Sequence, residues 1–429
     1  MNHKTLWLLL LLGSADVAAA QTTSNLPPVV GAAPRINPGT ANARRITLRA
    51  GVEAAYDSNV FGFSKSRSFL LRGRSRDDIS ITPTVQIDVF LPVGRHSVFA
   101  RGRAGYDFQL NNSQLNRERI NLEGGGTFQA TSSCTVSPTI AYGRARSNSG
   151  DVFVVTGDPL LARRNVEERT TLGAQAACGR ASGLSLTGGY QHVTYRNSAP
   201  IFKQNDLNQD LVNGSIGFQR PSLGRVAVYG NYGEVEYLNR FDLLGRSDAI
   251  RNYGAGLQFE RNIGSRASLA LSAGYSWVEP RSNTGKFSGT SYSGTLNLRP
   301  TDRFSVDLLV SRSVDFATTT FASYTVSEVY SLNGTYRLSR RLSANFGSSY
   351  QTRDYKFSTG IPGLAIPLSG DSFTRAYGGV VYDLNRRLRL NALVSQQKRD
   401  SKVLFAANNS DFDYTNTTVS VGASLLLGR

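Results

Sequence analysis

The chain has 429 residues, of which 40% are hydrophobic, 42 are glycine, 21 are phenylalanine and 19 are tyrosine, and its formal net charge is +17. Low hydrophobicity with abundant glycine and aromatic residues argues against a helical membrane protein and suits a sheet that shows lipid only half of its residues. The charge is also typical of nucleic-acid-binding proteins. The secretory start of the chain argues against nucleic acid, so a basic lumen, basic turns or contacts with anionic lipid or polysaccharide are the better explanations.

Residues 1–20 have the features of a secretory signal peptide. Lys4 supplies the positive start, Leu6 to Leu12 the apolar segment, and Ala18-Ala19-Ala20 the small residues before a cleavage site, which we predict after Ala20. The apolar segment is much shorter than the roughly 20 residues that a membrane-spanning helix needs. No later stretch approaches that length. A membrane location would therefore require a closed barrel, because lipid offers no hydrogen-bond partners to an open sheet edge.

Residues 21–45 are rich in proline, alanine, threonine and asparagine and are predicted to form a flexible periplasmic leader. The pattern changes at Ile46, where apolar and mostly polar residues begin to alternate. Successive side chains of a strand point to opposite faces, so this segment reads as one membrane strand with an apolar and a polar face. The barrel is predicted to comprise residues 46–429.

The two-faced strand recurs in pairs joined by short turns, and the clearest pair spans Tyr377 to Gln397. Recurrence at near-constant spacing indicates one repeated hairpin unit. The turns are predicted at 92–95, 132–134, 179–183, 221–224, 262–265, 300–302, 339–341 and 385–386. They predict an all-β fold, a transmembrane antiparallel β-barrel of about 18 strands. A count of 16 is acceptable too, because the alternation slips between Tyr190 and Val193, where a bulge would fit.

Aromatic residues flank the apolar band at both strand ends, as expected at the two headgroup levels of a membrane. One set lies near the short turns: Phe90, Phe128, Phe218, Phe259, Tyr336 and Tyr382. The other lies at the far ends: Tyr56, Phe108, Tyr142, Tyr195, Tyr237, Tyr275, Trp277, Tyr324 and Tyr350. A propeller of similar repeat length would not require these aromatics. Short periplasmic turns and longer extracellular loops are the asymmetry expected of a barrel.

A family resemblance rests on short motifs. The segment Tyr56-Asp57-Ser58-Asn59-Val60-Phe61 resembles the tyrosine-aspartate-x-asparagine-valine signature of the putative β-barrel porin 2 group, and the turns at 337–343 and 383–389 resemble its arginine-rich turns. The resemblance implies a Gram-negative outer-membrane barrel surrounded by lipid, with a link to exopolysaccharide export and no catalytic residues or cofactors. Its implied partners are the barrel-insertion machinery and polysaccharide or a secretion apparatus.

One feature departs from the common pattern of such barrels, which finish in an aromatic residue that the insertion machinery reads. This chain ends in Leu425-Leu426-Leu427-Gly428-Arg429. The alternation from Val419 to Leu427 still predicts a last strand, so the departure concerns the insertion signal.

Cys134 and Cys178 lie equally far from an outer connection bounded by residues 147 and 165. Antiparallel pairing then places both cysteines opposite each other at the periplasmic end of one strand pair. We predict a stabilising disulfide, since the compartment is oxidising. Two reduced cysteines in adjacent turns are the alternative, because the register is uncertain.

The parity of each strand predicts a lumen with a surplus of arginine. The inward-pointing arginines are Arg49, Arg101, Arg103, Arg119, Arg169, Arg353, Arg375, Arg389 and Arg399, against the acidic residues Glu53, Asp107, Glu123, Glu260 and Asp307. Arginine favours anions through its field and through bidentate contacts to carboxylate or phosphate. The alternative is that these charges only pair with one another across the lumen. The apolar loop 151–161 is either a constriction, a surface that contacts a partner or lipid, or an ordinary turn-forming loop.

Catalysis and metal binding find little support. After signal removal only His96 and His192 remain. His96 lies beside a turn and His192 in the middle of an irregular strand, as expected of ordinary surface or lumen residues, and they form no histidine pair for a metal. Calcium binding by acidic loops is not tested by the sequence. Two hypotheses follow: a porin-like channel for passive diffusion of anionic or saccharide solutes, or a non-conducting structural or assembly component of a polysaccharide secretion system.

Overall fold

The computed structural model describes residues 44–66, 68–71, 73–146, 165–241, 245, 247–281, 286–316, 322–357, 368–403 and 412–428. The predicted signal peptide and the apolar loop 151–161 lie outside these ranges. So do residues 21–43 of the predicted leader. Within the described ranges, no helix is long and apolar enough to cross a membrane.

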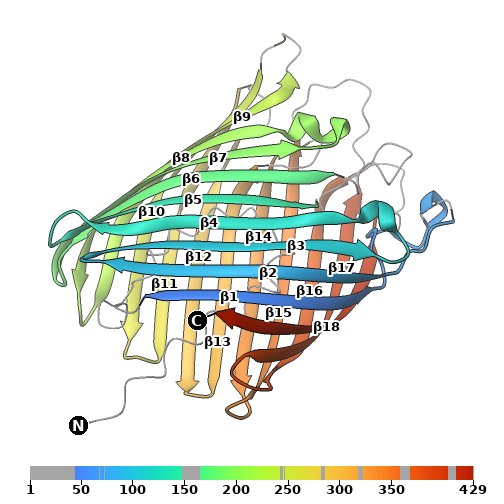
Figure 1. Ribbon diagram of the computed structural model, residues 1–429. Helices are drawn as coiled ribbons and strands as arrows, with labels where there is room; N and C mark the ends of the chain where they lie inside the picture. Colours follow the sequence, from blue (N-terminus) through green and yellow to red (C-terminus); the bar gives the residue numbers. More distant parts are fainter. Residues whose placement is uncertain are drawn as a thin grey trace.

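Strands make up most of the described chain (Figure 1). Their bounds are β1 Arg45–Asp57, β2 Asp78–Val93, β3 His96–Gln109, β4 Arg117–Gln129, β5 Cys134–Arg146, β6 Val166–Gly179, β7 Gly183–Asn197, β8 Leu207–Arg220, β9 Gly224–Phe241, β10 Ser247–Ile263, β11 Ala267–Pro280, β12 Phe287–Thr301, β13 Phe304–Phe316, β14 Ala322–Arg337, β15 Leu342–Phe357, β16 Leu368–Asp383, β17 Leu388–Val403 and β18 Tyr414–Gly428.

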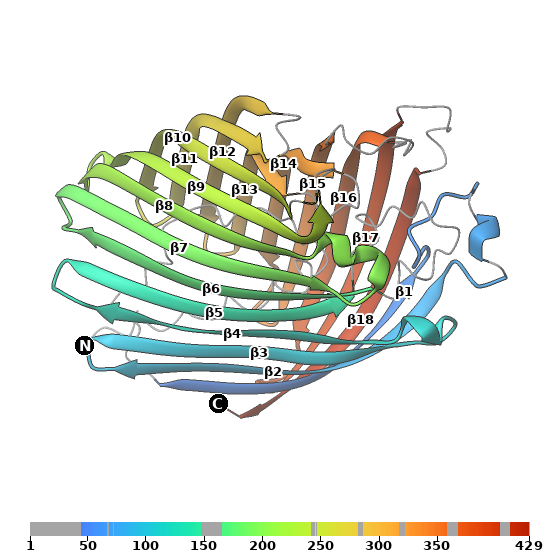
Figure 2. The same ribbon diagram turned by 90° about the horizontal axis from the view of Figure 1, so that it is seen from above.

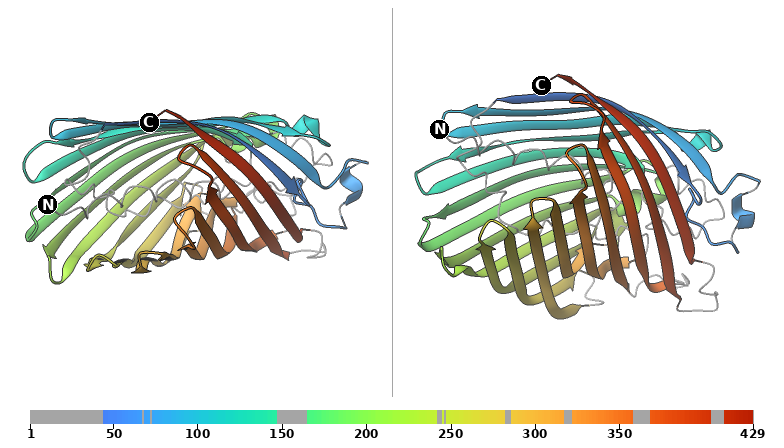
Figure 3. Two further views of the ribbon diagram at one scale, coloured as in Figure 1. Left: turned by 60° about the horizontal axis from the view of Figure 1, so that its bottom comes forward. Right: turned by 90° about the horizontal axis from the view of Figure 1, so that it is seen from below.

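The strands form one closed antiparallel barrel in which each strand pairs with its neighbours in the sequence. The sheet has 18 strands, and β1 pairs with both β2 and β18, which closes it. Figure 3 shows this closing pair from below, with the first and last strands side by side. The predicted fold class and the count of 18 strands are confirmed, and the alternative count of 16 is wrong.

The two ends of the barrel differ. Each even-numbered strand from β2 to β16 connects to the next one through a short turn, as predicted. At two of these turns Gly94 and Gly264 have φ values of 60° and 61°, a left-handed conformation that glycine adopts without steric cost. The opposite end carries the longer connections and the 3-10 helices η1 (Ser68–Leu71), η2 (Ser113–Leu115) and η3 (Pro200–Asn205), seen in Figure 2. We call these the short-turn end and the long-loop end.

The register assigns every strand an outer apolar and an inner polar face. On the outer face Val52 is 48% exposed, Val228 60% and Leu257 61%. Large apolar side chains this exposed, repeated around the whole wall, fit contact with lipid rather than with water. The inner positions carry the polar and charged residues of the alternation.

Three predicted membrane-interface aromatics lie on the inner face instead. Phe90 pairs with Arg45 and Phe99 at inner positions. Tyr195 and Tyr237 occupy inner positions of β7 and β9, where they are 8% and 0% exposed. The prediction was wrong because an aromatic near a strand end was assigned to the membrane interface without the register that fixes its face.

The bulge predicted in the middle of β7 is absent. β7 pairs continuously with β6 and β8 from Thr187 to Tyr195, without a register shift. The alternation only seemed to slip because His192 and Arg196 put polar side chains on outer positions. His192 pairs there with Asp210 of β8, and their side chains are 2.8 Å apart.

The family-like motif after β1 forms a compact structure at the closing strand pair. The Asn59 side chain donates to the carbonyl oxygens of Phe63 (2.9 Å) and Thr415 (3.3 Å) and accepts from the backbone N–H of Phe63 (3.1 Å). Val60 and Phe61 pack with Leu71 and Leu115 in a buried apolar cluster. The motif therefore fixes the first long connection against the last strand.

Candidate pore-lining site

All nine arginines predicted to point inward occupy inner positions of their strands. The assignments follow from the pairings of β1, β3, β4, β6, β15, β16 and β17 with their neighbours. Arg49 and Arg103, for example, both lie opposite Gln86 of β2. The arginines thus lie on the part of the wall formed by β15 to β18 and β1 to β6.

A ladder of alternating charge crosses four strands of this wall. Asp88 of β2 accepts from Arg45 of β1 at 3.1 Å and lies 3.5 Å from Arg101 of β3. Arg101 also lies 3.7 Å from Glu123 of β4. Because these side chains are partly exposed, each pair contributes little stability. The two arginines and two carboxylates of this ladder have no net charge.

A second pair lies nearer the long-loop end. Arg119 of β4 donates to Asp107 of β3 at 2.7 Å, and the Thr82 hydroxyl of β2 donates to the other carboxylate oxygen at 2.8 Å. Asp107 is therefore held from both neighbouring strands. Arg119 is a fixed counter-ion rather than a free cation.

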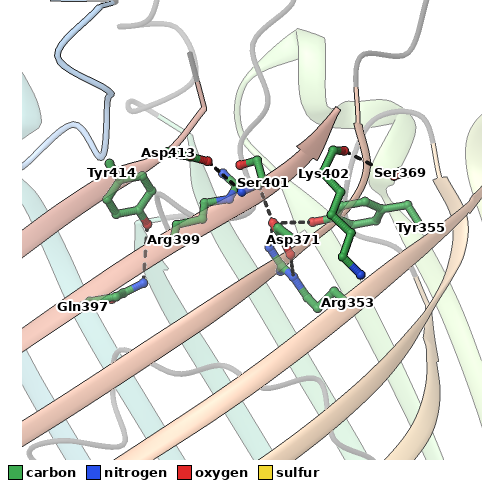
Figure 4. A network of polar contacts seen from close by, with 10 residues as sticks. All are labelled: Arg353, Tyr355, Ser369, Asp371, Gln397, Arg399, Ser401, Lys402, Asp413 and Tyr414. Atoms are coloured by element: carbon green, nitrogen blue, oxygen red, sulfur yellow. Dashed lines mark hydrogen bonds and ion pairs between the residues drawn. The ribbon is translucent and has the colours of Figure 1, made fainter. Parts of the chain in front are cut away.

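The most buried polar cluster surrounds Asp371 on β16 (Figure 4). Arg353 of β15 donates to both carboxylate oxygens at 2.8 Å, and Arg399 of β17 donates to Oδ2 at 2.5 Å. The Tyr355 hydroxyl donates to the same oxygen at 2.9 Å. Asp371 is fully buried, so its charge requires these partners.

An aromatic ring completes this cluster. The guanidinium carbons of Arg353 and Arg399 lie 4.6 and 5.3 Å from the centre of the Phe373 ring. Two guanidinium groups surround one carboxylate, and the ring face stabilises the additional positive charge. Three neighbouring strands are thereby tied together on the inner face.

The other predicted arginines differ in their partners. Arg389 donates to Asp383 at 2.7 Å across the turn between β16 and β17. Arg375 lies opposite Gln397 on the inner face of β16. Among the described residues, no carboxylate lies within ion-pair distance of Arg49, Arg103 or Arg169. These three guanidinium groups have charge available for a solute.

The opposite part of the wall carries few charges on its middle section. Its inner positions on β11 to β14 bear small hydroxyl side chains: Ser272, Ser276, Ser291, Ser293, Ser311, Ser327 and Ser331. Serine hydroxyls both donate and accept hydrogen bonds and leave more room than long side chains. An arginine wall therefore faces a hydroxyl wall.

An apolar cluster lies at the long-loop end of β7 to β14. Tyr195, Leu207, Val235, Tyr237, Ile250 and Val278 come from inner positions, and Val314, Tyr324 and Val326 pack with them. Ile250, Val235 and Tyr237 are fully buried. Sequence patterns did not predict this cluster, because its members are scattered over many strands.

Cys134 and Cys178 lie directly opposite each other near the short-turn end and are disulfide-bonded, with Cα atoms 4.1 Å apart. His96 accepts from the backbone N–H of Gln129 at 3.1 Å. No group of histidine, cysteine or acidic side chains in the described part of the chain could hold a metal ion.

Three inner charges escaped the sequence reasoning. Asp371 was not predicted to lie on a strand, whereas β16 begins at Leu368. Arg45 was assigned to the leader, although β1 begins there. Asp88 lies on the same face of β2 as the polar residues Thr84 and Gln86. The alternation along β2 could therefore have predicted its inner position.

One family model matches most of the chain, and several solved structures are similar to it. The model of the family described as "Putative beta-barrel porin 2" matches residues 48–426. The chain is similar to the outer membrane protein opdK from Pseudomonas aeruginosa, at 14% identity and a TM-score of 0.43, covering 89% of this chain and 99% of that chain. It is also similar to OccK2 (OpdF) of Pseudomonas aeruginosa, solved in complex with glucuronate, at 15% identity and a TM-score of 0.44, covering 90% of this chain and 97% of that chain. The FrpB iron transporter of Neisseria meningitidis is similar at 9% identity and a TM-score of 0.48, covering 89% of this chain and 70% of that chain. A search of curated proteins found no match.

Proposed function

The chain belongs to the Putative beta-barrel porin 2 family, and we propose that this outer-membrane barrel is a channel for the passive diffusion of anionic or saccharide solutes. Barrels of 16 to 18 strands are wide enough to enclose an aqueous channel. Family membership indicates a channel rather than an enzyme.

The observation that carries the anion preference is the charge on the arginine wall. Arg49, Arg103 and Arg169 have no carboxylate within ion-pair distance among the described residues, whereas Arg101 and Arg119 are neutralised. Uncompensated guanidinium groups along a pore attract anions and can bind carboxylates through two parallel hydrogen bonds. Four of the facing serines are half-buried and can offer hydrogen bonds to the hydroxyl groups of a sugar: Ser272, Ser291, Ser293 and Ser331.

The test is the reversal potential of the purified protein in planar bilayers under a potassium chloride gradient. We expect channels whose reversal potential has the sign of chloride preference. Cation preference would contradict the proposed selectivity, and the absence of conductance from correctly folded protein would contradict the channel itself.

The ion pairs on the inner face favour a second candidate function. Arg353, Arg389 and Arg399 hold ion pairs that tie neighbouring strands together, as a structural barrel would require. The alternative proposal is therefore a non-conducting structural or assembly component of a polysaccharide secretion system. Solute-dependent swelling of liposomes would support the channel, and neighbouring polysaccharide genes would support the secretion role.

The partners also remain proposals. We infer that the apolar outer wall contacts outer-membrane lipid, that the barrel-insertion machinery places it there after signal-peptide cleavage, and that polysaccharide or a secretion apparatus meets its ends. The link to exopolysaccharide export is supported by the family resemblance and by the hydroxyl and arginine walls.

A further inference from the structure

Pairs of arginines lie directly opposite each other at the short-turn end. The backbone N–H of Arg299 on β12 donates to the carbonyl oxygen of Arg266, just before β11, at 2.6 Å. Arg337 of β14 donates in the same way to Arg303, just before β13, at 2.7 Å. Arg299 and Arg337 occupy inner positions of β12 and β14, and Arg266 and Arg303 lie opposite them at the ends of the adjoining turns. Like charges directly opposite each other on a sheet repel.

These four arginines form no ion pair within the described chain, although the charge of Arg299 acts on the Asp307 carboxylate of β13. Arg266, Arg299 and Arg303 are exposed and Arg337 is half-buried, and no carboxylate of the described chain lies within ion-pair distance of any of them. Asp302 lies in the turn before Arg303. Anions from outside would lessen the repulsion between the two arginines of each pair.

The row continues along the rim toward the closing strands. The carbonyl oxygen of Arg341 accepts from the backbone N–H of Asp383, and that of Arg387 accepts from Leu426, both at 2.8 Å. Asp383 is already bound to Arg389. We name Arg266, Arg299, Arg303, Arg337, Arg341 and Arg387 the mouth arginines.

Acidic side chains gather at the other end of the barrel. The long-loop half carries Asp57, Asp78, Asp107, Glu118, Glu167, Glu168, Asp206, Asp210, Glu234, Glu236, Asp248, Glu279, Glu328, Asp354, Asp371, Asp400 and Asp413. The same half also carries many basic residues, among them Lys65, Arg119, Arg353, Arg399 and Lys402, so its acidic side chains do not make it a negative pole of the barrel.

We propose that the mouth arginines bind the carboxylate groups of an acidic polysaccharide at the periplasmic opening. A guanidinium group binds a carboxylate bidentately, and several of them along a rim suit a polymer that carries many carboxylates. The outer positions beside the row are apolar or aromatic, Leu298, Phe304 and Tyr336, so lipid headgroups are the competing anion that the experiment must separate from the polymer. This assignment rests on the proposed channel and gives it a substrate class and a side of entry.

The experiment measures the binding of fluorescein-labelled oligogalacturonate to the full-length protein in nanodiscs of zwitterionic lipid, with labelled neutral dextran of equal size as a reference probe. Wild-type protein should bind the oligogalacturonate and not the dextran. The variant R266Q/R299Q/R303Q/R337Q should bind about tenfold more weakly.

The matched control removes the same number of charges from exposed lysines at the long-loop end, in K65Q/K203Q/K398Q/K402Q. It should bind within about twofold of wild type, because those charges lie about a barrel length away and are screened. Circular dichroism and heat-dependent gel mobility show whether both variants are folded.

Several outcomes would overturn the assignment. Absence of oligogalacturonate binding to wild type would do so, as would equal losses in the two folded variants, which would indicate net charge alone. Loss of polymer binding when anionic phospholipid is added to the nanodiscs would assign the row to lipid headgroups. Anion-selective conductance without polymer binding would refute only this inference, whereas polymer binding without conductance would refute only the channel.

Discussion

The Asn59 side-chain amide donates to the carbonyl oxygen of Thr415 across a separation of 356 positions in the chain. Asn59 belongs to the motif that follows the first strand, and Thr415 belongs to the last strand, so the bond joins the two ends of the barrel domain. Asn59 is 1% exposed and makes further bonds with Phe63. The family-like motif therefore has a structural role at the point of closure.

We expect Asn59→Ala to destabilise the barrel by about 1–3 kcal/mol, because two carbonyl oxygens and one N–H at this partly buried site lose their partner. The measurement is urea unfolding of the protein in lipid vesicles, followed by tryptophan fluorescence. Asn262→Ala at the exposed short-turn end is the control and should leave the midpoint unchanged. Equal midpoints for the two variants would contradict the role assigned to Asn59.

Asp371→Ala should cost about 3–5 kcal/mol, because it leaves Arg353 and Arg399 buried beside each other without a counter-ion. Asp400→Ala breaks an exposed pair with Lys398 and should cost less than about 1 kcal/mol. The same unfolding assay compares them. If both variants lose the same stability, the Asp371 cluster does not hold β15 to β17 together.

Reduction of the Cys134–Cys178 disulfide should lower the stability by about 2–4 kcal/mol, because the bond restricts the unfolded chain over a separation of 44 positions. Unfolding is measured with and without dithiothreitol. The variant C134S/C178S should match the reduced wild-type protein and should not respond to the reductant. Free thiols at both positions in mass spectrometry of the native protein would refute the bond.

The double variant R49Q/R103Q should roughly halve the chloride-to-potassium permeability ratio in planar bilayers, because it removes two inner charges that have no carboxylate within ion-pair distance among the described residues. Arg251 lies on the outer face and is paired with Glu234, so Arg251→Gln is the control and should leave the ratio unchanged. An unchanged ratio in R49Q/R103Q would show that these two arginines do not set the selectivity.

The alternation of apolar and polar residues and the spacing of the turns were enough to predict most of the fold. They identified the strands, the short turns and the relative faces within each strand, because the side-chain period of a strand is local. The inner positions of Arg49 and Arg103 follow from this periodicity alone. The same reasoning failed for Tyr195 and Tyr237, because an aromatic residue near a strand end is compatible with either face.

The partners of the inner charges needed the register. Asp371 and Arg399 are 28 positions apart, and nothing local in either segment shows that they meet. Likewise, the opposition of Arg266 and Arg299 depends on how β11 and β12 align across their loop. A shift of one residue would turn every side chain of one strand to the other face.

The amino-acid sequence by itself determined that this protein is a two-faced, repeated sheet with an arginine-rich inner face, because those properties depend on neighbours along one strand. Only the tertiary structure decided which arginines are neutralised and which keep their charge. Ion pairs form between side chains on different strands, and their distances are fixed by closure of the barrel between β1 and β18. Asn59 and Thr415 help to hold that closure.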